Sequence, residues 1–268
     1  MSKLITVFGC TGNQGGSVVK YILNDAELSK EYRIRGITRD TTKKSAQQLA
    51  KDGVELVTAD LNSTESLTSA LAGSHTVFLV TNYWETTDGD LEYQQGKNVT
   101  DVAQKVGVSR ILFSSLLHVT DESKGRLTHV PHFDSKANIE KYIRASGLDC
   151  TFFLPGYYMS LFIGAALKHA SSLRGAQILG SGSYYTPKEI VDTFSQVLGK
   201  KATFLQVSAD EYKSTLPPAV AAEYLDNQLF VEDPGYFLGA SLEPTLTLLD
   251  ARPTTWAEFL KKNASAWD

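Results

Sequence analysis

Three glycines near the start of the chain separate an apolar run from an amphipathic one. The apolar run Leu4–Phe8 predicts a buried parallel strand, and Ser17–Leu23 predicts a helix. Between them, Gly9, Gly12 and Gly15 predict a turn that suits a pyrophosphate, because the backbone can come close and the helix N-terminus offers unpaired N–H groups. The spacing differs from the G-x-G-x-x-G fingerprint, and glycines also mark ordinary turns. The strand–turn–helix context is what favours a dinucleotide site.

The composition excludes several classes of protein. The 268 residues carry a net charge of −4, which argues against direct binding to nucleic acid or to an anionic membrane. No apolar run approaches the roughly 18 residues of a membrane span, and no signal peptide is recognised before the first strand. Two cysteines imply no disulfide framework, and no metal site is predicted. We therefore expect a globular cytoplasmic protein, monomeric or homodimeric, with a nuclear location reached through a partner as the alternative.

Predicted strands and helices alternate through residue 156. Gly53, Gly73, Gly107 and Gly147 each stand where a helix is expected to end, directly before the next strand. Strands separated by helices form right-handed βαβ units, so the pattern predicts an α/β fold with a Rossmann-type, doubly wound parallel sheet. The predicted strands are Leu4–Phe8, Arg33–Thr38, Val54–Ala59, Thr76–Val80, Arg110–Ser114 and Asp149–Leu154.

The alternation ends after Gly156, which predicts a Rossmann domain over residues 1–156 and a smaller, mostly helical C-terminal lobe over 157–268, packed on the same sheet. Cap residues followed by an acid three positions later mark helix starts at Asn62, with Glu65, and at Thr186, with Glu189. In the lobe we predict a helix over Pro187–Leu198, a strand over Thr203–Val207, helices near Pro218–Leu229 and Thr255–Asn263, and a break at Asp233–Gly235.

Ligands of open α/β sheets bind beyond the carboxyl ends of the strands, so the residues just after each strand are candidate site residues. Arg39 follows the second strand, and its guanidinium suits the 2′-phosphate of NADP(H), with Lys43 close behind. The adjacent Asp40 keeps NAD(H) open as the less favoured cofactor, and a solvated surface arginine is the ordinary alternative. Asp60, after the third strand, either flanks the adenine or serves as a turn residue.

Aromatic residues follow the fourth strand in the stretch Thr81–Glu85, and they either line a ligand groove or cover the rim of the core. Cys10 lies within the glycine turn. A helix N-terminus lowers a thiol pKa, so a redox-sensitive thiol is conceivable there, but a small side chain chosen for fit is the favoured interpretation.

The segment Pro131–Arg144 predicts a helix with His132, Lys136, Ile139 and Ile143 on one face. The isoleucines are expected to pack on the sheet. Lys136 is then expected to hydrogen-bond a nicotinamide ribose at the cleft, unless it extends to solvent. In the Tyr-x-x-x-Lys pattern of short-chain dehydrogenases, His132 takes the place of the catalytic tyrosine. A histidine transfers protons near neutral pH but does not hold a phenolate's position, which weakens the case for ordinary carbonyl reduction.

The stretches VFGCTGNQGGSV, TRD, LVTNYWE, QQGK and HFDSKANIEKYI resemble the NmrA-like family. These proteins are atypical relatives of short-chain dehydrogenases and include fungal nitrogen-metabolite repression regulators and an animal NADPH sensor. The resemblance is close over Leu4–Tyr158 and looser over Phe162–Trp256. It implies cofactor contacts by Gly9, Cys10, Thr11, Gly12, Asn13 and Gln14 (pyrophosphate), Arg39 and Lys43 (2′-phosphate), Asp60 and Leu61 (adenine), Thr81, Asn82, Tyr83 and Gln94 (nicotinamide half), Lys136 (ribose), and Tyr157, Tyr158, Met159 and Ser160 (over the nicotinamide).

The resemblance also implies a function. Family members of the regulator type bind the cofactor and lack the catalytic tyrosine, which agrees with His132. The resemblance therefore predicts an NADP(H)-binding redox sensor that regulates a protein partner. The alternative is an NADPH-dependent reductase of a small quinone, enone or ether substrate, with Lys136 and His132 as catalytic residues. A third interpretation is a degenerate Rossmann domain that serves as a structural subunit.

One stretch departs from the family pattern. Family members carry a longer segment, with a loop and a strand, before the helix that resembles Phe162–His169. This chain runs directly from Met159-Ser160 into Leu161-Phe162, so the segment is missing here. The resemblance then implies that the substrate side of the cleft is open or differently built, which argues further against catalysis.

Overall fold

The computed structural model describes residues 2–156 and 160–267. The elements up to residue 156 are β1 (Lys3–Val7), α1 (Asn13–Asn24), α2 (Leu28–Glu31), β2 (Tyr32–Ile37), α3 (Lys44–Lys51), β3 (Glu55–Val57), α4 (Thr64–Leu71), β4 (Thr76–Leu79), η1 (Tyr83–Glu85), α5 (Gly89–Lys105), β5 (Arg110–Ser114), α6 (Val119–Glu122), α7 (Pro131–Ser146) and β6 (Asp149–Pro155). They are followed by α8 (Ser160–Lys168), β7 (Gln177–Gly180), α9 (Pro187–Leu198), α10 (Ala209–Ser214), α11 (Pro218–Phe230), η2 (Val231–Gly235), α12 (Glu243–Leu246), α13 (Trp256–Lys262) and η3 (Ala264–Trp267).

Within the described residues, seven strands form one parallel sheet in the order β3-β2-β1-β4-β5-β6-β7. The predicted Rossmann-type fold with a smaller, mostly helical C-terminal lobe is confirmed, and each of the six predicted strands overlaps an observed one. The first strand, β1, lies between β2 and β4, so the turn that follows it leaves from the middle of the sheet's carboxyl edge.

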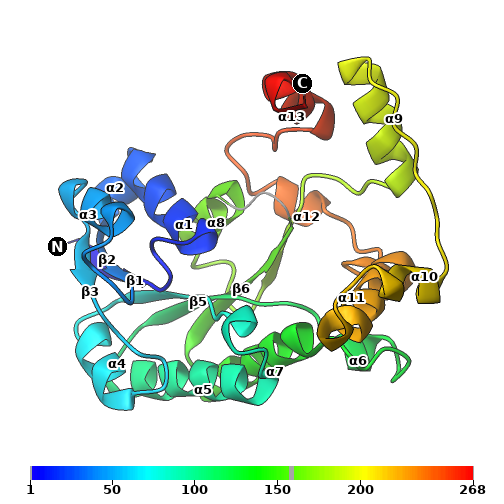
Figure 1. Ribbon diagram of the computed structural model, residues 1–268. Coiled ribbons are helices and arrows are strands. Elements are labelled where there is room, and N and C mark those ends of the chain that lie inside the picture. The colour runs from blue at the N-terminus through cyan, green and yellow to red at the C-terminus, as the bar shows by residue number, and fades with distance from the viewer. Residues whose placement is uncertain (1, 157–159, 268) are drawn as a thin grey trace.

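Helices cover both faces of this sheet (Figure 1). On one face, Val18 and Ile22 of α1 share an apolar core with Phe162 of α8. On the other face, α4, α5 and α7 cover the strands, and the buried Val99 and Ile139 belong to their common core. Burial on both faces explains why β1, β4, β5 and β6 are mostly continuous apolar runs, whereas β2 alternates apolar residues with Arg33 and Arg35.

One prediction about the lobe is wrong, and one strand was missed. Thr203–Val207 has no regular secondary structure and pairs with no strand in the described part of the chain. Figure 1 shows this stretch as a long connection at the periphery, between α9 and α10, and 78% of Leu205 is exposed there. An apolar run forms a strand only where a neighbour supplies hydrogen bonds. The short run Gln177–Gly180 has such a neighbour in β6 and becomes β7.

Helix boundaries follow the predicted signals more closely. The four glycines expected at helix ends all have positive φ angles. The values are 89° for Gly53, 73° for Gly73, 79° for Gly107 and 80° for Gly147, as the left-handed conformation that closes the last turn of an α-helix requires. The helix Pro187–Leu198 is confirmed at both bounds as α9, with Thr186 and Glu189 in the predicted capping box. The helices predicted near Pro218–Leu229 and Thr255–Asn263 appear as α11 and α13, and Asp233 breaks the helical backbone where predicted.

The cap predicted at Asn62 is wrong by one residue. The N-cap of α4 is Ser63, whose hydroxyl accepts a hydrogen bond from the Ser66 N–H. Asn62 instead donates its backbone N–H to Asp60 Oδ1 at 2.9 Å, which holds it in the preceding turn. Two adjacent residues with cap-forming side chains cannot be ranked from the sequence, because the choice depends on what the turn before them binds.

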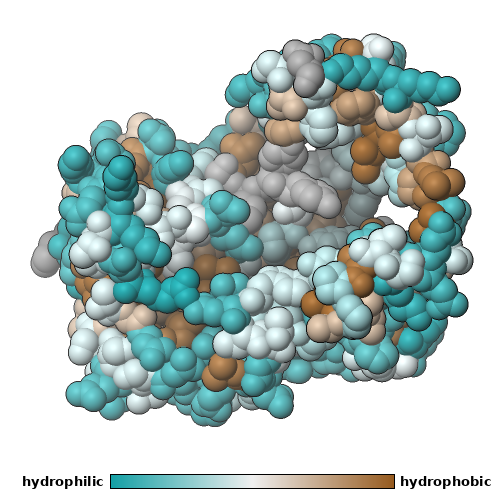
Figure 2. All heavy atoms as spheres, viewed as in Figure 1, coloured by the Kyte–Doolittle hydropathy of each residue, from teal (hydrophilic) through white to brown (hydrophobic). Residues whose placement is uncertain are grey.

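The lobe places a pair of helices apart from the sheet. Helix α9 packs on α13, where Trp256 Nε1 donates to the Ile190 carbonyl at 3.0 Å, and no residue of α9 is fully buried. Figure 2 shows the molecular face hollowed between this helix pair and the body that contains the sheet. Helix α11 lies on the other side of the hollow, close to α6 and to the start of α7 (Figure 1).

The close approach of α1 to β1 depends on Gly15. A Cβ at this position would lie 2.4 Å from the carbonyl oxygens of both Phe8 and Gly9, which are backbone atoms. We therefore predict that Gly15→Ala lowers the free energy of unfolding in urea by about 2 kcal/mol or more. Gly89→Ala is the control, because its Cβ would meet its nearest neighbour, Pro131, at an ordinary 3.5 Å. Equal stabilities of the two variants would contradict this packing.

Candidate functional site

The glycine turn leaves β1 at the centre of the carboxyl edge. Gly9 has a positive φ of 63°, and its carbonyl accepts a hydrogen bond from the Gly12 N–H at 2.8 Å. Helix α1 begins at Asn13, and in the described part of the chain no side chain caps the start of this helix. Thr11, Gly12 and Asn13 are exposed. The turn therefore presents the first N–H groups of α1 to an anion, as the sequence predicts.

Three buried polar atoms lie at the same edge without a hydrogen-bond partner among the described residues. They are Gln14 Oε1, in the first turn of α1, Thr81 Oγ1, after β4, and Ser114 Oγ, at the end of β5. Buried polar atoms are nearly always hydrogen-bonded, so these three atoms indicate a place where a polar ligand supplies the partner. The residues present thus fit a dinucleotide at this edge.

Arg39 follows β2 and forms an ion pair with Glu85, the last residue of η1. The Arg39 side chain remains 73% exposed. Its neighbour Asp40 interacts with Thr42 instead. The Asp40 carboxylate accepts hydrogen bonds from the Thr42 N–H at 2.8 Å and from the Thr42 hydroxyl, and these bonds lower the pKa of Asp40. Lys43 is exposed at the N-cap of α3. Glu85 was not among the predicted site residues, although it belongs to the aromatic stretch after the fourth strand.

The residues expected at the adenine form a small hydrogen-bonded group. Asp60 Oδ1 accepts from both the backbone and the side chain of Asn62, so Asp60 is a turn residue in this structure. The Leu61 carbonyl accepts from Asn98 Nδ2 at 2.9 Å, and Gln94 Nε2 donates to Asn98 Oδ1 at 2.8 Å. Leu61 and Gln94, predicted for opposite halves of a cofactor, are thus linked through one asparagine of α5.

Lys136 lies on α7 and forms an ion pair with Glu92 of α5. Glu92 is only 1% exposed and also accepts a hydrogen bond from the Ser135 hydroxyl. Burial lowers the pKa of Lys136, while the Glu92 carboxylate acts in the opposite direction. As expected, Lys136 does not extend to solvent, and the group that it contacts is the Glu92 carboxylate of the same chain. Glu92 was missed, although its place four residues before the buried Gly96 shows that it faces inward.

His132, on the same face of α7, contacts the C-terminal lobe. Its Nδ1 atom is hydrogen-bonded to Glu223 Oε1 of α11, and Tyr83 of η1 donates its hydroxyl to Glu223 Oε2 at 3.2 Å. Burial lowers the pKa of His132 to about 4 and raises the pKa of Glu223. Burial and the nearby Glu223 raise the pKa of Tyr83 to about 12. Imidazole and phenol are therefore neutral at physiological pH.

Aromatic rings enclose this contact. The Trp84 ring lies 4.8 Å from the His132 ring and 5.8 Å from the ring of Tyr224, the residue after Glu223. The sequence does not reveal Glu223 as a site residue, because it comes 91 residues after His132 and no local motif marks it. Only the folding of α11 against α7 brings them together.

The remaining predicted residues divide between described and undescribed parts. Asn82 stands at the N-cap of η1, between Thr81 and Tyr83. Tyr157, Tyr158 and Met159 lie outside the described residues, and Ser160 is the first residue of α8. Cys10 is 1% exposed, and burial raises its pKa to about 11, which fits a small packing residue and not a reactive thiol.

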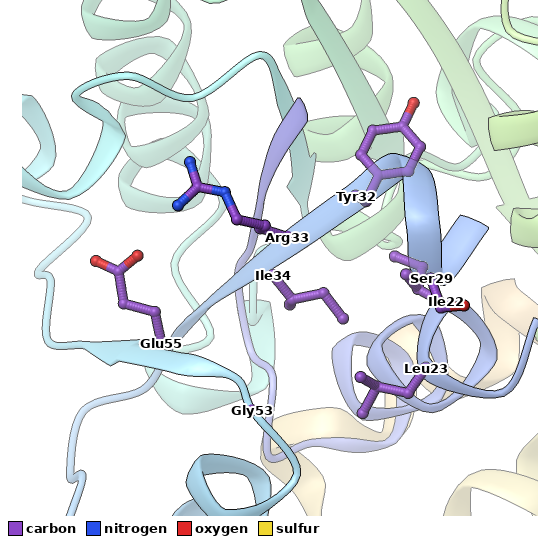
Figure 3. A pocket seen from close by; sticks show the side chains of 8 residues that line it. All are labelled: Ile22, Leu23, Ser29, Tyr32, Arg33, Ile34, Gly53 and Glu55. Carbon is purple, nitrogen blue, oxygen red and sulfur yellow. The ribbon is translucent and has the colours of Figure 1, made fainter. Parts of the chain in front are cut away.

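A separate cavity lies at the opposite edge of the sheet. It has a volume of about 290 Å³ and is lined by Ile22, Leu23, Ser29, Tyr32, Arg33, Ile34, Gly53 and Glu55. Figure 3 shows Arg33 and Glu55 on one side of β2 and Leu23 and Ile34 on the other. Tyr32 is the first residue of β2, so this cavity adjoins the amino ends of the strands and is separate from the candidate site. Among the described residues, no helix could span a membrane, and no cluster of histidine, cysteine and acidic side chains could hold a metal ion.

Known proteins share this architecture. The fold superimposes on the negative transcriptional regulator NmrA in complex with NADP, with a TM-score of 0.79, 16% identity and coverage of 99% of this chain and 96% of that one. The same regulator has also been solved with NAD. An NADPH-dependent quinone oxidoreductase of Escherichia coli gives a TM-score of 0.76 with 23% identity, over 98% of this chain and 100% of that one. At these identities the likeness shows a common Rossmann-type fold.

Sequence comparison defines the family. The model of the NmrA-like family matches residues 1–166 and 161–260, and so the chain belongs to this family. An NmrA-like family domain-containing oxidoreductase of Penicillium ochrochloron is 34% identical over 194 residues, which are 70% of this chain and 54% of that protein. The chain spans about half the length of such fungal relatives. The two matched stretches overlap at residues 161–166, next to the position where the sequence predicts that a family segment is missing.

The low pKa of His132 predicts a pH dependence of stability. Its folded pKa, about 4, lies below the ordinary value of 6.5, so between these values the unfolded chain binds a proton that the folded chain does not. The contribution of His132 to the stability of the folded chain is therefore fully present above pH 6.5 and is lost as the pH falls from 6.5 toward 4. Relative to His132→Gln, the wild-type free energy of unfolding should drop by about 2 kcal/mol between pH 7.5 and 5 in urea titrations.

Glu223 has a raised pKa, which acts in the opposite direction, and it is hydrogen-bonded to His132, so the difference between the two proteins reports the titration of this pair. Parallel curves for the wild type and His132→Gln would show that the imidazole titrates as it does in the unfolded chain.

Proposed function

We propose that this chain is an NADP(H)-binding redox sensor that regulates a protein partner in the cytoplasm. The proposal has two parts, a cofactor site at the carboxyl edge of the sheet and a regulatory role in place of catalysis. The first part is supported by the start of α1 and by the buried Gln14 Oε1 and Thr81 Oγ1, for which the described residues supply neither a side-chain cap nor a hydrogen-bond partner. It is supported also by family membership and by the NADP named in the NmrA complex.

In this proposal the chain's own residues take distinct parts of the cofactor. The N–H groups of the first turn of α1 bind the pyrophosphate, and Arg39 binds the 2′-phosphate by charge-assisted hydrogen bonds. When bound, the cofactor supplies two redox states that differ in the charge and shape of the nicotinamide. The proposed contacts are Gly9, Cys10, Thr11, Gly12, Asn13 and Gln14 (pyrophosphate), Arg39 and Lys43 (2′-phosphate), Asp60 and Leu61 (adenine), Lys136 (ribose), and Thr81, Asn82, Tyr83, Gln94, Tyr157, Tyr158, Met159 and Ser160 (nicotinamide half).

The regulatory part rests on one observation, the contact between His132 and Glu223. A dehydrogenase presents a proton donor at this position of the helix to its substrate. Here the His132 imidazole is neutral, packs against the Trp84 ring and is hydrogen-bonded to the Glu223 carboxyl group of the C-terminal lobe. A change beside the nicotinamide therefore acts directly on a contact between the sheet-bearing part and the lobe, which is what a sensor requires.

A second candidate is an NADPH-dependent reductase of a quinone, enone or ether substrate. It is favoured by Lys136, a buried cation whose pKa is lowered by burial and which lies on the same helical face as His132. Curated relatives are named oxidoreductases, and a structural neighbour is a quinone oxidoreductase. In this reading Lys136 orients the cofactor ribose and supports transfer of a proton to the reduced substrate.

Calorimetric titration with NADPH, NADP⁺, NADH and NAD⁺ tests the cofactor site. We expect the phosphorylated cofactors to bind at least about tenfold more tightly, because Arg39 contributes a charge-assisted bond. Arg39→Gln should remove this preference. Arg33→Gln, which changes an exposed arginine at the other end of β2, should keep it. Absence of binding by the wild type would contradict the proposal.

Oxidation of NADPH with a quinone, an enone and an ether as acceptors separates the two candidates. The sensor proposal predicts no acceleration over the uncatalysed reaction. Under the reductase alternative, turnover is present and Lys136→Met abolishes it. The double variant Lys136→Met, Glu92→Gln keeps the buried site neutral and controls for folding, because Lys136→Met alone leaves the Glu92 carboxylate buried without its ion-pair partner, at a cost of about 3–5 kcal/mol.

A further inference from the structure

The ion pair of Arg39 with Glu85 has a consequence for the choice of cofactor. We propose that Glu85 is a specificity-determining residue, which competes with the 2′-phosphate of NADP(H) for the Arg39 guanidinium. The inference rests on the proposed cofactor site, in which Arg39 binds that phosphate.

The position of the ion pair within the sheet supports this role. Arg39 comes two residues after the end of β2, and Glu85 ends η1, which follows β4. Strands β2 and β4 flank β1, so the Arg39–Glu85 ion pair spans the carboxyl end of the strand from which the glycine turn leaves. A ligand that extends from this turn toward the end of β2 meets both charges.

Glu85 is the acidic side chain that the structure pairs with Arg39. The neighbouring Asp40 is bound to the backbone and hydroxyl of Thr42 instead. Side-chain exposures of 73% for Arg39 and 49% for Glu85 leave both groups accessible to a ligand. A phosphate group that approaches the guanidinium therefore meets one carboxylate already in contact with it.

The charges determine the direction of the effect. A 2′-phosphate must displace Glu85 from Arg39 or lie beside a like charge, and either costs affinity. NAD(H) carries a hydroxyl at this position and meets no such opposition. Exposed ion pairs are weak, so the penalty corresponds to a change of about fivefold in affinity. Arg39 favours NADP(H), and Glu85 limits how far that preference extends.

The test compares Glu85→Gln, which keeps the side-chain shape, with the wild type and with Glu31→Gln. Glu31 forms an exposed ion pair with Lys3 near the amino end of β1, so its variant controls for the loss of one negative charge. Each protein is titrated calorimetrically with NADP⁺, NAD⁺, adenosine 2′,5′-bisphosphate and adenosine 5′-monophosphate, at low and at high salt. Circular dichroism and Glu85→Ala check that any effect comes from the lost charge.

We expect Glu85→Gln to bind NADP⁺ and the bisphosphate about fivefold more tightly than the wild type at low salt, with NAD⁺ and the monophosphate unchanged. Glu31→Gln should match the wild type. If the wild type binds NADP⁺ and Glu85→Gln keeps the wild-type ratio of NADP⁺ to NAD⁺ affinities, or weakens both, the role of Glu85 is overturned and the cofactor site stands. If no nucleotide binds any of the proteins, the proposed function is overturned together with this inference.

Discussion

The interaction on which the candidate site depends is the buried ion pair between Lys136 and Glu92. A charge taken out of water is tolerated only beside an opposite charge, so α5 and α7 must pack in the one alignment that joins these two side chains. Ser135 adds a hydrogen bond to the same carboxylate. This alignment fixes the first turn of α7, and with it the position of His132 at the sheet's carboxyl edge.

The three residues of η1 connect that edge to the rest of the molecule. Tyr83 donates to Glu223 of the lobe, Trp84 packs on His132 and Tyr224, and Glu85 binds Arg39 after β2. A ligand that moves Glu85 therefore acts on a short turn whose other two side chains contact residues of the lobe. This arrangement offers a route by which cofactor binding could affect the lobe, because η1 contacts both Arg39 of the proposed phosphate site and Glu223 of α11.

Much of the fold follows from local signals in the sequence. Glycines with positive φ end the helices of the sheet-bearing part, and Thr186 and Glu189 define the start of α9, because these signals act within one turn of the chain. Thr203–Val207 has the composition of a strand, but its outcome depends on a partner that lies elsewhere in the chain, and no strand pairs with it in the part described. Conversely, β7 was not predicted from its four residues, but it forms because β6 supplies a neighbouring strand.

The candidate site shows the same division. The glycine turn, Arg39 and the shared face of His132 and Lys136 are visible in the sequence, because each depends on one motif or on one helical period. The carboxylates that bind these side chains, Glu85, Glu92 and Glu223, were not predicted. Each comes from a different element and meets its partner only after the tertiary fold forms, so no spacing in the sequence indicates the pair.

The most direct measurement of the central claim is hydrogen exchange of the η1 and α11 amides with NADPH and with NADP⁺, each at saturation. If the nicotinamide side of the site is coupled to the lobe through His132 and Glu223, the exchange rates of α11 differ between the two redox states. Exchange in α11 that is identical in the NADPH and NADP⁺ complexes would contradict the account.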